Sequence, residues 1–217
     1  MKKKSLLKIT LFFKFIKVLI LAFVFIPQSF SKDKLSKNKK EIIGSIERQK
    51  DRLIEISDKI WEAAETSLQE FKSSKYLSDY AEENGFTVER GVADIPTAFT
   101  ATYGSGRPYI GIMGEYDANA GISQKRQPTK ETRIKGGAGH GCGHNLFGTA
   151  SLGAAIAIKE LIEKGEISGT VIFFGTPAEE TIFAKVWMVR AGLFDDLDVC
   201  MDWHPGDNTE ASTQSSK

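Results

Sequence analysis

Cysteine and net charge are both scarce in this sequence of 217 residues. It contains only two cysteines, Cys142 and Cys200, which is too few for a framework of several disulfides. Lysine and arginine (29) nearly balance aspartate and glutamate (28), so the net charge of +1 gives no bias toward nucleic acid or an acidic partner. We also find no internal repeat and no low-complexity tract. A hydrophobic content of 41% is sufficient for one sizeable core.

The N-terminus has the composition of a secretory signal peptide. Residues 1–4 are basic after the initial methionine, residues 18–26 are wholly apolar, and small residues follow at the positions that signal peptidase reads. We therefore expect residues 1–31 to be a signal peptide and the chain to be exported to a periplasm or out of the cell. No stable membrane span is expected after cleavage. The alternative is an uncleaved membrane anchor over residues 11–26, where two lysines interrupt the apolar run.

Hydrophobic spacing in the rest of the chain predicts an α/β fold. Residues 32–40 are charged and poor in apolar residues, as is typical of a linker. Ser67 is the expected N-cap of the second of four helices. The helices are predicted over residues 40–61, 67–83, 146–161 and 184–191, and the strands over residues 86–92, 98–103, 109–113, 170–174 and 197–203. This alternation predicts a mixed sheet flanked by helices.

A glycine-rich heptapeptide at residues 139–145 contains Cys142, His144 and His140. Thiolate and imidazole are common ligands of zinc and related metals, and glycine lets the backbone fold tightly around such a site. Because Cys142 and His144 flank a single glycine, an extended backbone would project both to the same side. The two cysteines are expected to remain apart, because Cys142 lies in this motif. A buried structural cysteine with two surface histidines is the alternative interpretation.

Polar residues that can bind metal follow two of the predicted strands. Glu179 and Glu180 come shortly after residues 170–174, and His204 ends the run at residues 197–203. Open α/β sheets bind ligands at the carboxyl ends of their strands. One of two adjacent carboxylates can bind metal while the other acts as a general base. An acidic helix start and a surface histidine are the alternatives.

Two less specific features lie between these motifs. Glu115 and Asp117 follow the strand at residues 109–113, where a carboxylate can orient a metal ligand or form a solvated turn. The long loop at residues 121–137 is rich in lysine and arginine. Its cations can attract a substrate carboxylate, or the loop can simply be solvated.

In this order, the segments at residues 110–117, 139–145, 175–180 and 203–205 resemble the dinuclear metallo-amidohydrolases. That superfamily includes aminoacylase and carboxypeptidase G. The Cys-Gly-His-Asn and Gly-Thr-Pro-Ala-Glu-Glu sequences look most similar to the branch of the aminobenzoyl-glutamate hydrolases and related dipeptidases. The resemblance implies that residues 41–217 are the N-terminal part of a zinc-peptidase-like catalytic domain, incomplete and without a lid domain.

The resemblance also implies a function. It suggests hydrolysis of amide bonds in N-acyl amino acids, aminobenzoyl-glutamate-like amides or dipeptides, with one or two divalent ions, zinc or manganese. Metal-ligand positions fall on Cys142, His144, Glu180 and His204, the general-base position falls on Glu179, and Asp117, Glu115 and His140 are placed around the ligands. In this interpretation Glu115 stands where the wider superfamily has a histidine.

Several departures from the family pattern lead to further expectations. Residues 119–120 and 181–184 differ from the usual motifs, and family members continue into a lid or dimerisation domain that contributes to homodimers. A further histidine ligand, expected from that missing part, has no counterpart here. We therefore expect activity to be impaired by truncation.

Two alternative functions remain. One is a non-catalytic fragment that binds metal weakly or needs a partner chain. The other is a thiol enzyme with Cys142 as nucleophile and His144 or His140 as base, although neighbours one residue apart have poor geometry for proton transfer. Dependence on metal distinguishes a thiol enzyme from a metallohydrolase.

Overall fold

The computed structural model describes residues 35–208, and the predicted signal peptide lies outside them. The described chain begins with helix α2 (Lys37–Ala63). Ser36 caps this helix, because its hydroxyl oxygen accepts a hydrogen bond from the backbone N–H of Lys39 at 3.3 Å. The helix therefore begins within residues 32–40, which the sequence suggested were a linker.

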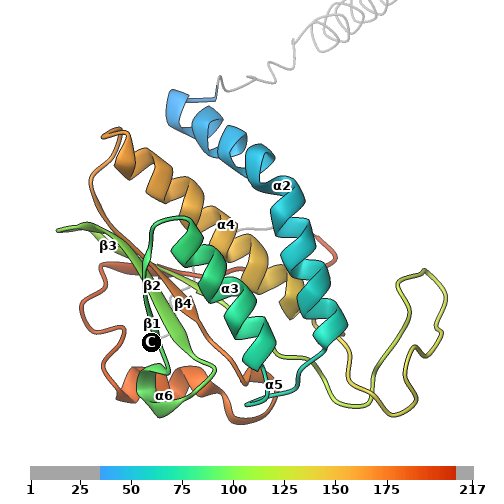
Figure 1. Cartoon of the computed structure of the whole chain (residues 1–217). Coiled ribbons are helices and arrows are strands. Elements are labelled where there is room, and N and C mark those ends of the chain that lie inside the picture. The colour runs from blue at the N-terminus through green and yellow to red at the C-terminus, as the bar shows by residue number, and fades with distance from the viewer. Residues whose placement is uncertain (1–34, 209–217) are drawn as a thin grey trace, which may run out of the picture. The chain divides into compact units, whose positions relative to one another are not determined.

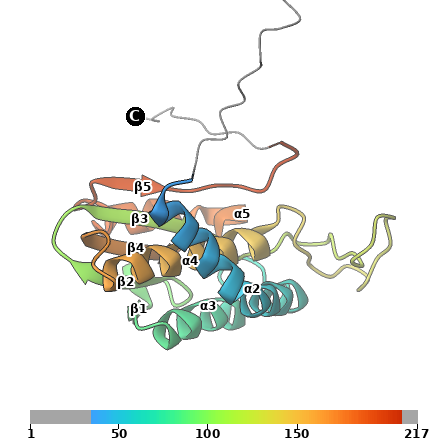
Figure 2. The same ribbon diagram turned by 90° about the horizontal axis from the view of Figure 1, so that it is seen from above.

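Five strands form one mixed sheet, as predicted. Their order is β1-β2-β4-β3-β5 (Figure 2). β1 pairs antiparallel with β2, and β2 pairs antiparallel with β4, whereas β3 runs parallel to both β4 and β5. The strands are β1 (Thr87–Arg90), β2 (Phe99–Ser105), β3 (Tyr109–Gly114), β4 (Gly169–Gly175) and β5 (Val199–Met201). β4 is central and almost entirely buried, which explains its continuous apolar sequence.

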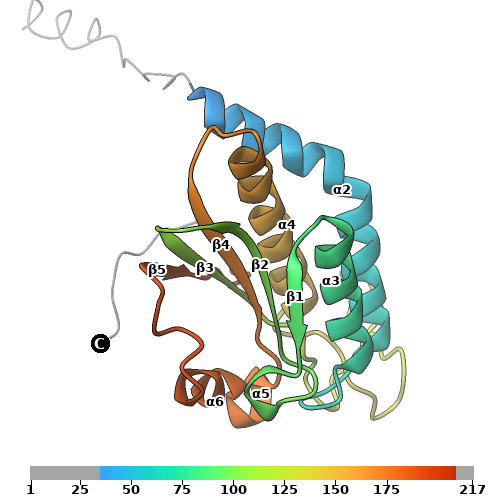
Figure 3. The same ribbon diagram turned by 60° about the vertical axis from the view of Figure 1, so that its left-hand side comes forward.

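Helices α2, α3 (Phe71–Glu83) and α4 (His144–Glu163) cover one face of the sheet (Figures 1 and 3). Ile60 of α2 and Leu152 of α4 meet Phe173 of β4 in the main core. In the described part of the chain, α4 is the one helix long and apolar enough to cross a membrane, but 61% of its most apolar window is buried here. Its apolar composition is explained by its position between the sheet and α2.

A second, smaller core lies on the other side of the strands. The short helix α5 (Glu179–Ile182) and helix α6 (Ala184–Arg190) follow β4 (Figure 3). The 3-10 turn η1 (Val92–Asp94) lies between β1 and β2 in the chain. Met188 of α6 packs with Phe174 and Ile95 in this core. The turn that carries Glu179 is thus anchored by the helix that follows it.

Two local predictions are wrong. Ser67 does not cap α3, which begins at Phe71; its hydroxyl instead donates to Asp117 Oδ2 at 2.9 Å. β5 is only three residues long and exposed, whereas the sequence predicted a strand over residues 197–203. Within the described residues β5 pairs only with β3, along residues 199–201. Cys142 and Cys200 are unpaired, as predicted.

Candidate metal centre

The carboxyl ends of β3, β4 and β5 bring the polar residues of three segments to one edge of the sheet. These strands are parallel, so their ends lie side by side. Glu115 and Asp117 follow β3, Glu179 and Glu180 follow β4, and His204 follows β5. This is the juxtaposition that the sequence predicted.

The glycine-rich loop joins this edge through the start of α4. His144 is the first residue of the helix and is fully buried. Gly143 before it adopts a left-handed conformation, with φ of 84°, and a side chain there would meet Pro205 at 3.1 Å. Cys142 and His144 therefore converge around a left-handed turn. The extended backbone that the sequence suggested is not present, because helix α4 starts immediately after this glycine.

Asp117 fixes the orientation of His144. The Nδ1 atom of His144 lies 3.0 Å from Asp117 Oδ1, and as N–H it donates to that carboxylate. A buried carboxylate in this position is the usual partner of a metal-binding histidine, since it directs the other ring nitrogen toward the metal. Asp117 also accepts from the backbone N–H of Glu180 at 2.9 Å, so one carboxylate holds two segments of the site.

Two buried atoms of this cluster have no hydrogen-bond partner. They are His144 Nε2 and Glu180 Oε1, and they lie 3.9 Å apart. Glu115 Oε2 approaches Nε2 to 2.9 Å, but the direction does not make a hydrogen bond. Ligands that are about 2.0 to 2.2 Å from one zinc ion are roughly 3 to 4 Å from each other. The unsatisfied atoms therefore fit a divalent cation between them.

His144 belongs to two groups of candidate ligands. Cys142, His144 and His204 each offer an atom within 4.8 Å of the others, and so do Glu115, His144 and Glu179. The first group combines sulfur and nitrogen donors, which suit zinc, whereas the second adds carboxylate oxygens, which manganese also accepts. This donor set can hold a divalent ion and place a carboxylate beside it.

Burial and charge set the ionisation of the cluster. Burial opposes the charge on His144, but the contacts with Asp117 and Glu115 outweigh it and raise the pKa of His144 to about 10. Burial, followed by the negative charge of Glu180, raises the pKa of Cys142 to about 11. Burial also raises the pKa of Glu179 above its ordinary value, and Glu115 adds to this effect. A raised carboxyl pKa suits a group that takes and returns a proton near neutral pH.

His140 is not brought into either ligand group. Its Nε2 atom lies 3.2 Å from the carbonyl oxygen of Ile60, and its Nδ1 atom is buried without a partner. Burial lowers the pKa of His140 to about 4, so the ring is neutral. The described contacts thus connect His140 to α2 and show no direct bond to a candidate ligand.

Two contacts of the site were not predicted from the sequence. Lys185 of α6 forms an ion pair with Glu115, and Asn119 Oδ1 accepts the backbone N–H of Cys142 at 3.3 Å. Asn119 occupies one of the positions where the motif departs from the family pattern, and that departure was the only available signal. Lys185 lies in helix α6, where the spacing of the apolar residues predicts only that the helix packs against the core and gives no sign of a site residue.

The basic loop at residues 121–137 is partly attached to α2. The guanidinium groups of Arg126 and Arg133 lie over the ring of Trp61, at 4.9 Å and 4.8 Å from its centroid. Arg126 also pairs with Asp58 at 3.0 Å. These two cations are therefore engaged by the helix and do not point to a substrate site.

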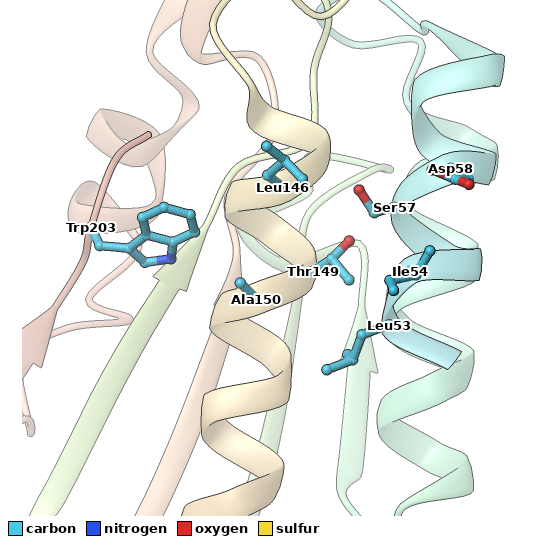
Figure 4. A pocket seen from close by; sticks show the side chains of 8 residues that line it. All are labelled: Leu53, Ile54, Ser57, Asp58, Leu146, Thr149, Ala150 and Trp203. Carbon is cyan, nitrogen blue, oxygen red and sulfur yellow. The ribbon is translucent and has the colours of Figure 1, made fainter. Parts of the chain in front are cut away.

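A separate apolar pocket of about 340 Å³ lies beside α4 (Figure 4). Leu53 and Ile54 of α2, Leu146 of α4, and Trp203 line it. The indole N–H of Trp203 donates to Ser151 Oγ at 3.1 Å, which fixes the segment just before His204. None of the candidate ligands lines this pocket, so it is distinct from the metal centre.

The chain is similar in sequence to known peptidases and hydrolases. Residues 111–215 match the model of peptidase family M20/M25/M40. The chain is 49% identical over 167 residues to one of the subunits of p-aminobenzoyl-glutamate hydrolase from Escherichia coli, covering 76% of this chain and 34% of that protein. It is 29% identical over 182 residues to the Xaa-Arg dipeptidase of Homo sapiens, covering 76% of this chain and 38% of the relative.

Solved structures show the same fold. A dinuclear metal-binding M20 peptidase from Bacillus subtilis superposes with a TM-score of 0.59 at 26% identity, covering 69% of this chain and 41% of that one. The aminobenzoyl-glutamate utilization protein from Klebsiella pneumoniae superposes with a TM-score of 0.55 at 15% identity, covering 76% of this chain and 46% of that one. The chain thus shares the fold of part of these solved structures and spans about a third of the length of the curated relatives named above.

Proposed function

We propose that this chain provides the metal-binding and general-base residues of an amide-bond hydrolase, and the match of residues 111–215 to the model of peptidase family M20/M25/M40 supports this proposal. The observation that carries the proposal is the pair of buried, unpartnered atoms on His144 and Glu180, with Glu179 beside them. In this proposal Cys142, His144, Glu180 and His204 bind one or two divalent ions.

Each residue of the cluster has a defined task. Asp117 holds Nδ1 of His144, so that Nε2 faces the cation site. A divalent ion there would lower the pKa of a bound water and polarise the carbonyl of the scissile amide. The Glu179 carboxylate takes the proton of the attacking water and then delivers it to the leaving amine nitrogen. Glu179 is suited to this task because its side chain keeps 29% exposure while lying 4.0 Å from His144 Nε2.

The substrate class follows from the relatives. One is named for hydrolysis of p-aminobenzoyl-glutamate and another for hydrolysis of Xaa-Arg dipeptides, so the proposed substrates are small amides, including N-acyl amino acids and dipeptides. Zinc is favoured over manganese by the thiolate ligand. Export through the N-terminal segment and formation of a homodimer are further parts of the proposal.

Metal analysis and hydrolysis assays on the purified chain test the proposal. We expect stoichiometric zinc or manganese, and release of amine from p-aminobenzoyl-glutamate, an N-acyl amino acid or a dipeptide. Glu179→Gln should lower kcat by about 100-fold or more, because general-base catalysis contributes about 10² to 10⁴. Glu163→Gln, on the exposed end of α4, is the matched control and should leave kcat unchanged.

The same assays separate the proposal from its alternatives. Turnover that persists after complete removal of metal would contradict it and would favour the thiol enzyme. Bound metal without turnover would contradict the proposed hydrolysis by this chain and would favour the alternative of a non-catalytic chain that binds metal or needs a partner chain. A chain that takes up no metal would contradict the proposed centre itself.

A further inference from the structure

Glu70 is a fully buried carboxylate that the proposed reaction does not use. It stands at the N-cap of α3, yet its side chain makes no capping hydrogen bond to that helix. A buried carboxylate is costly unless its oxygens are hydrogen-bonded, so its partners should reveal its purpose. Those partners lie in two segments far from it in the sequence.

Both carboxylate oxygens of Glu70 are engaged. Oε1 accepts the backbone N–H of Ala178 at 2.9 Å, and Oε2 accepts the hydroxyl of Thr97 at 3.0 Å. The carbonyl oxygen of Thr97 in turn accepts the hydroxyl of Tyr116 at 2.5 Å, and Tyr116 lies between Glu115 and Asp117. Glu70 therefore connects the turn after β4 with the segment after β3.

The backbone of Ala178 has a conformation that such a bond can stabilise. It precedes Glu179 directly, is fully buried, and has a left-handed conformation with φ of 57° and ψ of 34°. For a residue with a Cβ this conformation is strained, because the Cβ comes close to the following carbonyl oxygen. The four-residue helix α5 that follows has no side-chain cap of its own. The bond to Glu70 is thus a fixed point for the backbone just before the acidic pair.

A second fixed point lies on the other side of Glu179. Asp117 accepts the backbone N–H of Glu180 at 2.9 Å. The residues before and after Glu179 are therefore each held by a buried carboxylate, while the Glu179 side chain is left to approach His144.

From this arrangement we infer that Glu70 is a positioning residue, which holds the backbone of Ala178 and thereby directs Glu179 and Glu180 into the metal centre. The inference rests on the proposed function for its catalytic consequence. Its structural part, the restraint on Ala178, can be measured without metal or substrate. The inference about Glu70 and the proposed function can therefore be contradicted independently.

Glu65 offers a matched control five residues away. Its carboxylate also accepts backbone N–H groups, those of Lys72 and Ser73, but these belong to the first turn of α3. Glu65→Ala therefore removes the same kind of bond without touching the turn after β4. Glu70→Gln is the conservative variant, because an amide oxygen can accept from Ala178 while the amide N–H donates to Thr97.

The first experiment measures amide hydrogen exchange by NMR in the metal-free full chain. We expect Glu70→Ala to accelerate exchange at Ala178 by about 10-fold or more, with Ser73 unchanged, and Glu65→Ala to do the reverse. Glu70→Gln should retain slow exchange at Ala178. If Glu70→Ala does not fold, Glu70→Asp replaces it, because the shorter side chain keeps the charge but cannot reach both partners. Unchanged exchange at Ala178 in Glu70→Ala, or in Glu70→Asp where it takes its place, would overturn the inference.

The second experiment follows Co²⁺ binding by visible absorption and, where the parent chain turns over, kcat and KM. Glu70→Ala should weaken Co²⁺ binding and lower kcat, each by about 10- to 100-fold, with KM changed far less, because small misplacements of reacting groups cost up to this factor. Glu70→Gln should restore both quantities. Equal losses in Glu70→Ala and Glu65→Ala would show a general structural role and contradict the inference. A parent chain that binds no Co²⁺ would count against the proposed function, while the exchange data would still decide the role of Glu70.

Discussion

At the scale of single residues, the neighbours of a side chain decide its charge in this centre. His144 lies between Asp117 and Glu115 and is fully buried, so an imidazole that is mostly neutral in water holds its proton here up to a pKa of about 10. The Cys142 thiol stays protonated for the opposite reason, because burial and Glu180 disfavour its anion. A metal ion must displace both protons, since only the deprotonated groups are ligands.

We therefore predict that metal binding releases protons and strengthens as the pH rises. With folded-state pKa values of about 10 for His144 and about 11 for Cys142, both groups are protonated near pH 7.5 in the metal-free chain. Binding of Zn²⁺ should then release about two protons, and the logarithm of the apparent affinity should rise with pH up to those values. Calorimetric titrations in buffers of different ionisation enthalpy count the protons.

The two cysteines provide the control for this count. Burial also raises the pKa of Cys200 to about 11, but Cys200 is in neither ligand group. Cys142→Ser should release about one proton fewer, and Cys200→Ser should match the parent chain. Identical proton release by the parent and Cys142→Ser would show that the thiol is not a ligand.

At the scale of elements, the close approach of α4 to β3 positions His144 near Glu115. Gly148 makes this contact possible, because a Cβ at this position would lie 2.5 Å from the backbone oxygen of Glu115. Gly114 at the end of β3 is equally tight, since its Cβ would lie 2.9 Å from Gly148 Cα. The glycines thus let the helix and the strand approach closely. This contact lies near His144 at the start of α4 and near Glu115, which follows β3.

We predict opposite effects for two glycine-to-alanine changes in helices. Gly148→Ala should lower the free energy of unfolding by about 1 to 3 kcal/mol, because the added methyl group must push α4 away from β3. Gly44→Ala in α2 should raise it by about 0.5 to 1 kcal/mol, because its Cβ would meet only the flexible end of Arg48 at 3.4 Å and alanine favours helix. Urea unfolding of both variants measures the difference, and a Gly148→Ala chain as stable as the parent would contradict the packing argument.

At the scale of the whole described molecule, the sheet is what joins the parts of the site. Three parallel strand ends and the start of α4 supply residues of the site that are separated by tens of residues in the chain, such as Glu115, His144 and His204. A bound ion would connect these elements to one another in the folded state only. Metal binding should therefore stabilise the entire fold rather than one loop.

We predict that metal removal lowers the thermal stability of the chain. At a free zinc concentration about 100 times Kd, the gain in unfolding free energy should be about 2.7 kcal/mol, and a chelator should abolish it. Glu180→Ala should lose most of this gain. Calorimetric melting with and without zinc measures it, and an unchanged Tm in the parent chain would argue against a metal centre in the native state.

The elements and the residues of the motifs can be derived from the sequence alone. Periodic apolar residues located the helices and strands, and the position of Glu179, Glu180 and His204 after strands predicted that they would meet, because parallel strands end at a common edge. The sequence predicted local geometry less well. Ser67 was expected to cap a helix, but its hydroxyl instead donates a tertiary hydrogen bond to Asp117.

The groups that support the site are selected by tertiary packing. The contacts of Glu70 with Ala178, Asn119 with Cys142 and Lys185 with Glu115 each join residues from different segments. None of them leaves a periodic or spaced signal in the sequence, because single polar residues in helices and loops look alike until packing places one beside a particular backbone N–H or carboxylate. The proposed ligands thus form a recognisable pattern of residue types in the sequence, whereas their orientation depends on how separate elements pack.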